Sequence, residues 1–203
     1  QCDGYSAYPA WVKDKPWVKL MGCHAHVRRK FFEATAQAQG LAGWILRQLG
    51  HLYRIEARLR DAKAGPALRL SVRAAESKVI HRRLHKVITL LAKRNILPKS
   101  KLGKAVCYAV NQWPQLERYL EDGRVEIDNN LVENAIRPTA LGKKNWLFIG
   151  ADTAGDRGAI LYTVIESCRR RGLDPYAYLK DVLTRLPAMT NRQLPEITPA
   201  NWG

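Results

Sequence analysis

Two carboxylates stand out in a short segment of an otherwise basic chain. The segment VEIDNNLVENAIRP, residues 125–138, contains Asp128 and Glu133 with adjacent asparagines between them. Carboxylate and amide oxygens of this kind suit hard divalent cations such as Mg²⁺. Asp128 or Asn129 can also accept hydrogen bonds from a first helical turn, and Pro138 is expected to end that helix. The segment therefore predicts a short capped helix that holds Glu133 on rigid backbone.

The same residues also fit an ordinary surface helix. Leu131, Val132 and Ile136 fall at helical spacing and would face a core. Glu133 and Arg137 lie four residues apart and could form an exposed ion pair. Because such a pair is common on solvated helices and contributes little, this pattern alone does not identify a site.

The charge of the whole chain indicates a polyanionic partner. The 203 residues include 34 Lys and Arg against 18 Asp and Glu, which gives a net charge of +16. Residues 41–95 alone contain 13 Lys and Arg and 3 Asp and Glu, a balance of +10. Such a charge favours fast, salt-sensitive association with nucleic acid. A hydrophobic content of 46% is enough for a folded core.

The sequence offers no sign of export or membrane insertion. No run of about 18 apolar residues occurs, and the N-terminus lacks the layout of a signal peptide. We therefore expect a cytoplasmic protein that does not enter a membrane. Its cysteines are far apart and are expected to be reduced thiols; they are Cys2, Cys23, Cys107 and Cys168.

Apolar periodicity predicts a β-α-β-α beginning followed by long helices. A strand end and turn at Asp3-Gly4 would precede a helix at 5–12, a strand at 17–23 and a helix at 26–39. The next helices are expected at 41–62, 66–96 and 102–120, with Pro66 at the first helical position and a bend possible at Pro114. A strand at 144–150 and helices at 153–171 and 175–186 would complete the chain.

Four sequence blocks resemble the C-terminal part of transposases of the insertion-sequence-66 family. They are CDGYSAY, GCHAHVRRKFFEA, YLEDGRVEIDNNLVENAIRPTALGKKNWLFIGADTAG and DPYAYLKDVLTRLP. The blocks occur in the family's order, and the likeness is weakest in residues 41–100. The resemblance implies an α/β, mostly helical fold, a partial ribonuclease-H-like transposase core interrupted by a helical insertion. It assigns residues 1–40 to the core, 41–124 to the basic insertion, 125–187 to the rest of the core and 188–203 to a tail.

The resemblance also implies an Asp, Asp, Glu catalytic triad. Asp3 in CDGY matches the second aspartate, and Glu133 in DNNLVENAIRP matches the glutamate. No residue of this sequence can be assigned to the first aspartate, so we expect the chain to lack the family's N-terminal portion and to be inactive alone. Two Mg²⁺ or Mn²⁺ ions would serve phosphodiester cleavage and strand transfer in the complete enzyme. Asp128 is the competing carboxylate, which we interpret as a helix cap.

Two functions follow from this resemblance. The first is the catalytic part of a DNA transposase that moves an insertion sequence; the second is a truncated, inactive remnant that only binds DNA. The expected partners are transposon ends and target DNA, a second transposase copy and accessory proteins encoded by the same element. The expected location is the nucleoid of a bacterial cytoplasm.

Several further residues are candidates for DNA binding or local structure. Cys23 and His26 resemble a Cys-x-x-His signature of several transposase families, which implies a polar contact between them. A zinc site there, or at His81 and His85, is the weaker alternative because ligand pairs are missing. Trp146 could stack on an unpaired base or belong to the core. The cations that could contact phosphate are Arg28, Arg29, Lys30, Arg69, Arg73, Arg82, Lys86, Arg137, Lys143 and Lys144.

Overall fold

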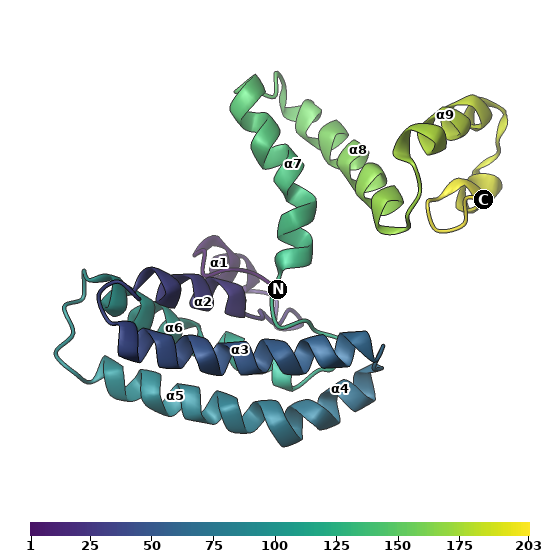
Figure 1. The fold of residues 1–203 in the computed structure, drawn as a ribbon. Helices are drawn as coiled ribbons and strands as arrows, with labels where there is room; N and C mark the ends of the chain where they lie inside the picture. Colours follow the sequence, from purple (N-terminus) through teal and green to yellow (C-terminus); the bar gives the residue numbers. More distant parts are fainter. The chain divides into compact units, whose positions relative to one another are not determined.

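Helices dominate the structure, a computed structural model that describes residues 1–203 apart from the side chain of Asp152 (Figure 1). The α-helices are α1 (Ala7–Val12), α2 (His24–Glu33), α3 (Gln39–Asp61), α4 (Pro66–Val72), α5 (Lys78–Ala92), α6 (Lys101–Glu117), α7 (Asn130–Trp146), α8 (Asp152–Arg170) and α9 (Pro175–Arg185). A π-helical turn, η1 (Arg73–Ser77), joins α4 to α5, and 3-10 turns form η2 (Arg118–Leu120), η3 (Leu186–Ala188) and η4 (Asn191–Ile197). The chain divides into two compact units, Gln1–Asn130 and Leu131–Gly203.

The first unit is a bundle of α2, α3, α5 and α6. Each of these helices contacts two of the others, and α3 and α5 lie side by side (Figure 1). Apolar side chains from all of them form one buried core that includes Phe31, Ile45, Leu84 and Leu116. Burial of such side chains is the main source of stability for helices of this length. Residues 1–40 and 41–124 therefore share one core.

The helical periodicity of the insertion is confirmed. Pro66 opens α4 at the first helical position, and Leu84, Ile88 and Leu91 lie buried along α5. The expected single helix at 66–96 is interrupted by η1, whose π-helical register brings Arg73 into the core. Such π-helical turns often occur at functional sites.

The strand expected at residues 17–23 is not formed. Residues 18–21 have no regular secondary structure, and pairing beside them is limited to one parallel bridge between Cys2 and Gly22, in which Cys2 N–H donates to the Met21 carbonyl over 3.0 Å. Gly22 N–H instead donates to the Gln115 carbonyl at 2.9 Å. A strand requires a neighbour along its length, and the backbone beside this segment belongs to α6. No strand occurs in the part of the chain that the structure describes.

The expected end of the acidic helix at Pro138 and the strand at 144–150 are also wrong. Helix α7 continues through Pro138 and ends at Trp146. A proline in a helix removes one hydrogen bond, and on this exposed helix water can satisfy the freed carbonyl. Leu147, with a left-handed φ of 61°, then ends α7. The residues after it are not part of a strand.

The second unit combines α7 from Leu131 onward with α8, α9 and the C-terminal turns. Asp174 caps α9 by accepting the N–H groups of Tyr176 and Ala177. The predicted tail packs on α9, because the Tyr178 hydroxyl donates to the Ile197 carbonyl at 2.6 Å and both residues are buried. None of the described helices combines the length and apolarity that a membrane span requires.

Two histidines lie inside the core of the first unit. His24 and His81 are buried with ring centroids 5.5 Å apart, and His81 also packs against Trp113 at 4.4 Å. His24 Nδ1–H donates to the Ile127 carbonyl over 3.1 Å. Burial lowers the pKa of His24 to about 4 and, together with the neighbouring histidines, that of His81 to about 2. Both imidazoles are therefore neutral at pH 7.

Acidification is expected to destabilise the first unit through these histidines. Their folded pKa values lie below the unfolded value near 6.5, so their contribution is complete above pH 6.5 and falls as the pH drops toward 4. Each histidine should remove about 1.4 kcal/mol of unfolding free energy per pH unit in that interval. His81→Phe should roughly halve this slope and should not destabilise the unit at pH 7, because both ring nitrogens lack a hydrogen-bond partner among the described groups. Urea titrations at pH 7, 5.5 and 4.5 measure the slope, and an unchanged slope in His81→Phe would refute the assignment.

Candidate nucleic-acid interface and carboxylate site

Asp3 and Glu133, the carboxylates matched to the triad, lie in different units. Asp3 follows the Cys2–Gly22 bridge and is partly buried; its Oδ1 accepts Tyr5 N–H at 3.0 Å, which fixes the turn that precedes α1. Glu133 lies in the first turn of α7 and is exposed. No group of three or more His, Cys, Asp and Glu side chains suited to a metal gathers within the described part of the chain.

Asp128 is held at the entrance to α7 by several donors. The Tyr53 hydroxyl donates to Oδ2 at 2.8 Å, Asn130 N–H donates to Oδ1 at 3.1 Å, and the Asn130 side-chain amide donates to Oδ2 at 3.0 Å. Burial and the charge of Asp128 raise the pKa of Tyr53 far above its usual value, so the hydroxyl remains a donor. Asp128 therefore binds the first N–H of α7, as a residue that starts a helix does.

Cys23 and His26 meet at the start of α2. The backbone N–H groups of Asn129, His26 and Ala25 are directed to the Cys23 sulfur. Burial nevertheless raises the pKa of this thiol, so Cys23 is a protonated, buried side chain. Its contact with Asn129 links α2 to the segment that leads into α7.

The central polar contact of the first unit is a buried ion pair. Arg73 and Glu56 are both completely buried, and Arg73 donates to the Glu56 carboxylate from Nε at 2.8 Å and from Nη2 at 2.7 Å. Its other donors reach the carbonyl oxygens of Tyr119, Asp122 and Val125 at 2.8 to 2.9 Å. All five N–H donors of the guanidinium are thus used. Burial alone would raise the pKa of Glu56, but the hydrogen bonds from Arg73 and Arg69 outweigh it and lower the pKa.

These contacts correct the predicted role of Arg69 and Arg73. Arg73 has no donor left for a phosphate, and Arg69 binds Glu56 at 3.0 Å and Glu126 at 2.8 Å with little exposure. Both arginines are therefore interior side chains, and they are removed from the cations that could contact DNA. The segment that they hold, residues 119–130, is hereafter the clamped segment. Its Ile127 carbonyl also accepts the backbone N–H of His24.

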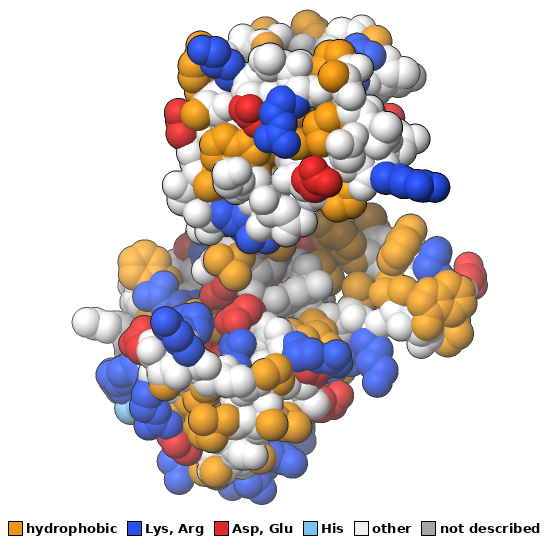
Figure 2. Space-filling model, turned by 90° about the vertical axis from the view of Figure 1, so that its right-hand side faces the viewer, with side chains coloured by type: hydrophobic (Ala, Val, Ile, Leu, Met, Phe, Trp, Pro, Cys, Tyr) orange, Lys and Arg blue, Asp and Glu red, His pale blue; other side chains and the backbone are white. Residues whose placement is uncertain are grey.

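The remaining cations of the insertion form an exposed surface on α3 and α5. On α3 they are seven and four residues apart, on the side opposite the buried positions, which is one face of a helix. On α5 the spacing likewise places them away from the buried stripe. Figure 2 shows that Lys and Arg side chains predominate over Asp and Glu on the lower body of the molecule. The basic surface is defined here as Arg47, Arg54, Arg58, Arg82, Lys86 and Lys93, all exposed.

The other predicted DNA-binding residues are mostly accessible. Arg28 and Arg29 are exposed on α2, whereas the Lys30 ammonium lies 4.7 Å from the ring centre of Tyr108 and is partly buried. In the second unit, exposed side chains on α7 include Arg137, Lys143, Lys144 and Trp146. Those on α2 belong to the first unit and those on α7 to the second.

Sequence reasoning missed Tyr53 and Glu56. A signal for Glu56 exists, because it lies four residues after Leu52 and seven after Leu49, on the apolar face of α3. An acid at such a position in a basic insertion predicts a buried partner of opposite charge. Tyr53 has no comparable signal, since its partner Asp128 is 75 residues away in sequence.

Comparison with known proteins identifies two matching families. The profile described as Transposase IS66 family matches residues 1–157, and the one described as IS66 C-terminal element matches residues 163–200. No solved structure matches the chain.

Three similar proteins come from Sinorhizobium fredii, the uncharacterized proteins y4jD, y4qI and y4hP. They are 35%, 36% and 34% identical to the chain over 100%, 92% and 89% of its length. The chain in turn spans only 40%, 35% and 34% of these relatives.

Breaking the buried ion pair is expected to destabilise the first unit strongly. Arg73→Met leaves Glu56 charged, buried and short of partners, so the unfolding free energy should fall by about 3 to 5 kcal/mol in urea titrations. The matched control is Arg58→Met, which breaks the exposed pair with Glu76 and should cost about 0 to 1 kcal/mol. Equal losses in the two variants would mean that the clamped segment does not depend on Arg73.

Proposed function

The chain belongs to the Transposase IS66 family, and we propose that it binds DNA through its basic surface and supplies two metal-ligating carboxylates for DNA cleavage and strand transfer. The observation that carries the proposal is the family match across residues 1–157 and 163–200, to which the exposed cations on α3 and α5 add a physical means of binding DNA. Exposed Lys and Arg side chains neutralise phosphates and release counterions, which gives affinity without sequence preference.

Asp3 and Glu133 are the residues that we propose as metal ligands. Their hard oxygens suit Mg²⁺ or Mn²⁺, and Glu133 is accessible on a helix whose first turn is fixed by Asp128. When bound, two such ions would activate the attacking oxygen and stabilise the leaving oxygen of a phosphodiester. The ribonuclease-H-like core implied by the resemblance stays a prediction, because it requires a sheet and the described residues form no strand.

A second candidate function is DNA binding without cleavage. It needs the exposed cations alone, which lie on α3 and α5 independently of Asp3 and Glu133. Both functions use the basic surface. They differ in whether the strand is cleaved, a step for which Glu133 would be required.

Removal of the basic surface tests DNA binding. The chain should bind duplex DNA and lose affinity steeply between about 50 and 200 mM salt. Replacing Arg47, Arg54, Arg82 and Lys86 with Gln should reduce the slope of log affinity against log salt by up to about 4, one for each lost phosphate contact. A matched control replaces four exposed lysines of the same unit, Lys13, Lys19, Lys99 and Lys104, and changes the net charge equally. Fluorescence anisotropy measures both; equal losses would indicate general charge attraction instead of a defined surface.

Cleavage is tested by separating Glu133 from Asp128. In a plasmid excision assay with a transposase that carries these residues, Glu133→Gln should abolish excision because it removes a charge that the metals need. Asp128→Ala should cost about 1 to 3 kcal/mol of stability, since it removes the acceptor for Tyr53 and Asn130, and should reduce excision only as far as it loosens α7. Thermal melts accompany both assays. A stable, inactive Asp128→Ala beside an active Glu133→Gln would make Asp128 the ligand.

A further inference from the structure

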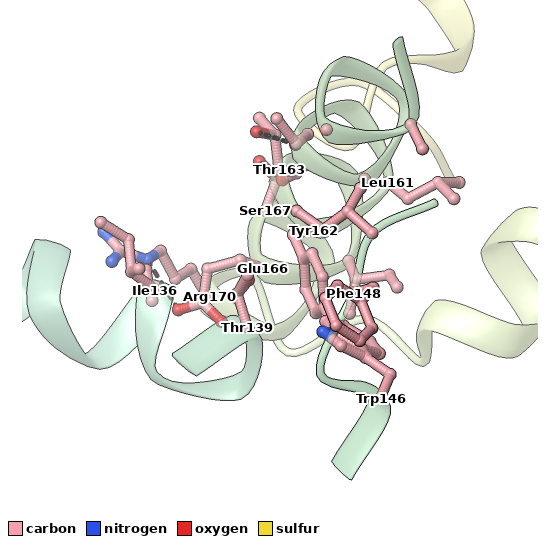
Figure 3. Close-up of a pocket in the computed structure, with 17 residues that line it drawn as sticks. Ile136, Thr139, Trp146, Phe148, Leu161, Tyr162, Thr163, Glu166, Ser167 and Arg170 are labelled. Carbon is pink, nitrogen blue, oxygen red and sulfur yellow. Dashed lines mark hydrogen bonds and ion pairs between the residues drawn. The ribbon is translucent and has the colours of Figure 1, made fainter. Parts of the chain in front are cut away.

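An apolar groove runs between α7 and α8 in the second unit. It has a volume of about 940 Å³ and is lined by Ile136 and Trp146 of α7, by Phe148, and by Leu161 and Tyr162 of α8. Figure 3 shows the side chains of Trp146, Phe148 and Tyr162 among those that line it. Trp146 is 45% exposed and Phe148 is 84% exposed. Aromatic side chains gathered in an open groove mark an interaction site more often than a core.

The backbone of α7 places the indole of Trp146. A Cβ atom at Gly142 would lie 2.9 Å from the ring, so the indole lies against the helix where glycine leaves room for it. Glycine in a helix interior lowers the stability of the helix, and Gly142 here makes space for the indole of Trp146. Leu147 then takes its left-handed φ of 61°, and Phe148 N–H donates to the Trp146 carbonyl over 2.7 Å, which keeps the two aromatic residues together.

Cations accompany the aromatic side chains of the groove. Arg170 lines it and is held by its bonds to the Leu131 carbonyl at 2.8 Å and to Glu166 at 3.1 Å. Lys143 is exposed and follows the groove residues Thr139 and Ile136 by four and seven positions, which places it on the same face of α7. Glu166 also lines the groove, and its carboxylate is paired with Arg170. The groove therefore offers ring faces for stacking, and Lys143 is the exposed cation on this face of α7 for a backbone phosphate.

We propose that this groove binds unpaired bases of single-stranded DNA; the inference rests on the proposed function. Inside a duplex both faces of each base are covered by its neighbours, so away from the duplex ends only an unpaired base can stack on Trp146 or Phe148. Stacking on aromatic side chains together with contact to cations is how proteins bind single strands without sequence preference, and each stacked base contributes about 5- to 100-fold in affinity. An apolar protein segment would make no use of the exposed cation at Lys143.

The test compares a blunt duplex with the same duplex that carries a single-stranded extension containing 2-aminopurine. The extension should raise the affinity of the chain at least about fivefold, and the 2-aminopurine fluorescence should fall on binding as the base stacks. Trp146→Ala should remove both effects, so that the blunt and the extended duplex bind with equal affinity. The matched control is Trp17→Ala, which removes another exposed indole, at 76% exposure in the first unit, and should retain both effects.

A second variant separates stacking from folding. Gly142→Ala should raise the melting temperature of the chain slightly because alanine is the better helix former. It should nevertheless lose the gain from the extension, since the added methyl displaces the indole. A merely structural role for Trp146 would not combine higher stability with weaker binding.

The outcomes distinguish the inference from the proposed function. If blunt duplex binds through the basic surface but the extension adds nothing, or its gain survives in Trp146→Ala, the groove does not bind bases. If Trp146→Ala instead only reduces self-association in sedimentation, the groove holds a second copy of the chain and the inference is overturned. Loss of all duplex binding refutes the proposed function alone, provided that single strands still bind through Trp146.

Discussion

The buried ion pair of Arg73 and Glu56 determines the position of the clamped segment, which contains Asp128. Moving two charges out of water costs several kcal/mol for each ion, and the attraction between them offsets this only when every donor and acceptor is used. Here every N–H group of Arg73 has an acceptor, and the carbonyl groups that it binds belong to residues 119, 122 and 125. The clamped segment cannot move away without leaving a buried guanidinium unsatisfied. The position of Asp128, at the end of that segment, therefore depends on an interaction inside the insertion.

The insertion consequently has charges of two kinds. Arg69 and Arg73 are neutralised by Glu56 and Glu126 and act within the fold, whereas the basic surface faces solvent. Most of the net charge of +10 in residues 41–95 lies outside the internal pairs, because without Arg69, Arg73 and Glu56 the remaining 11 Lys and Arg and 2 Asp and Glu still give +9. Helix α3 has one side chain for each role. Its Tyr53 hydroxyl donates to Asp128 within the fold, and the adjacent Arg54 is exposed to solvent. The proposed phosphate contacts and the support of α7 thus share one rigid element.

Sequence periodicity was sufficient for most helices but not for the parts that depend on distant contacts. The stripe at Leu84, Ile88 and Leu91 defines α5 locally, so it could be predicted. The composition of the apolar runs at 17–23 and 144–150 is compatible with a strand, a loop or a buried helix. Which of these forms depends on the segments that pack beside them. Asp3 and Glu133 were matched by family motif, whereas Arg73 was misread as a surface cation because charge alone does not reveal a buried partner.

Helix α7, which carries Glu133, has little packing of its own. The side chains expected to face a core, Leu131, Val132 and Ile136, are each more than half exposed, and no residue of the helix is buried. Most of the stability of a protein helix comes from packing of its apolar face, and Pro138 and Gly142 weaken this one further. Its fixed points are the first N–H bound by Asp128 and the Leu131 carbonyl bound by Arg170. A partner that covers this face must stabilise α7 by mass action, and with it the backbone that positions Glu133.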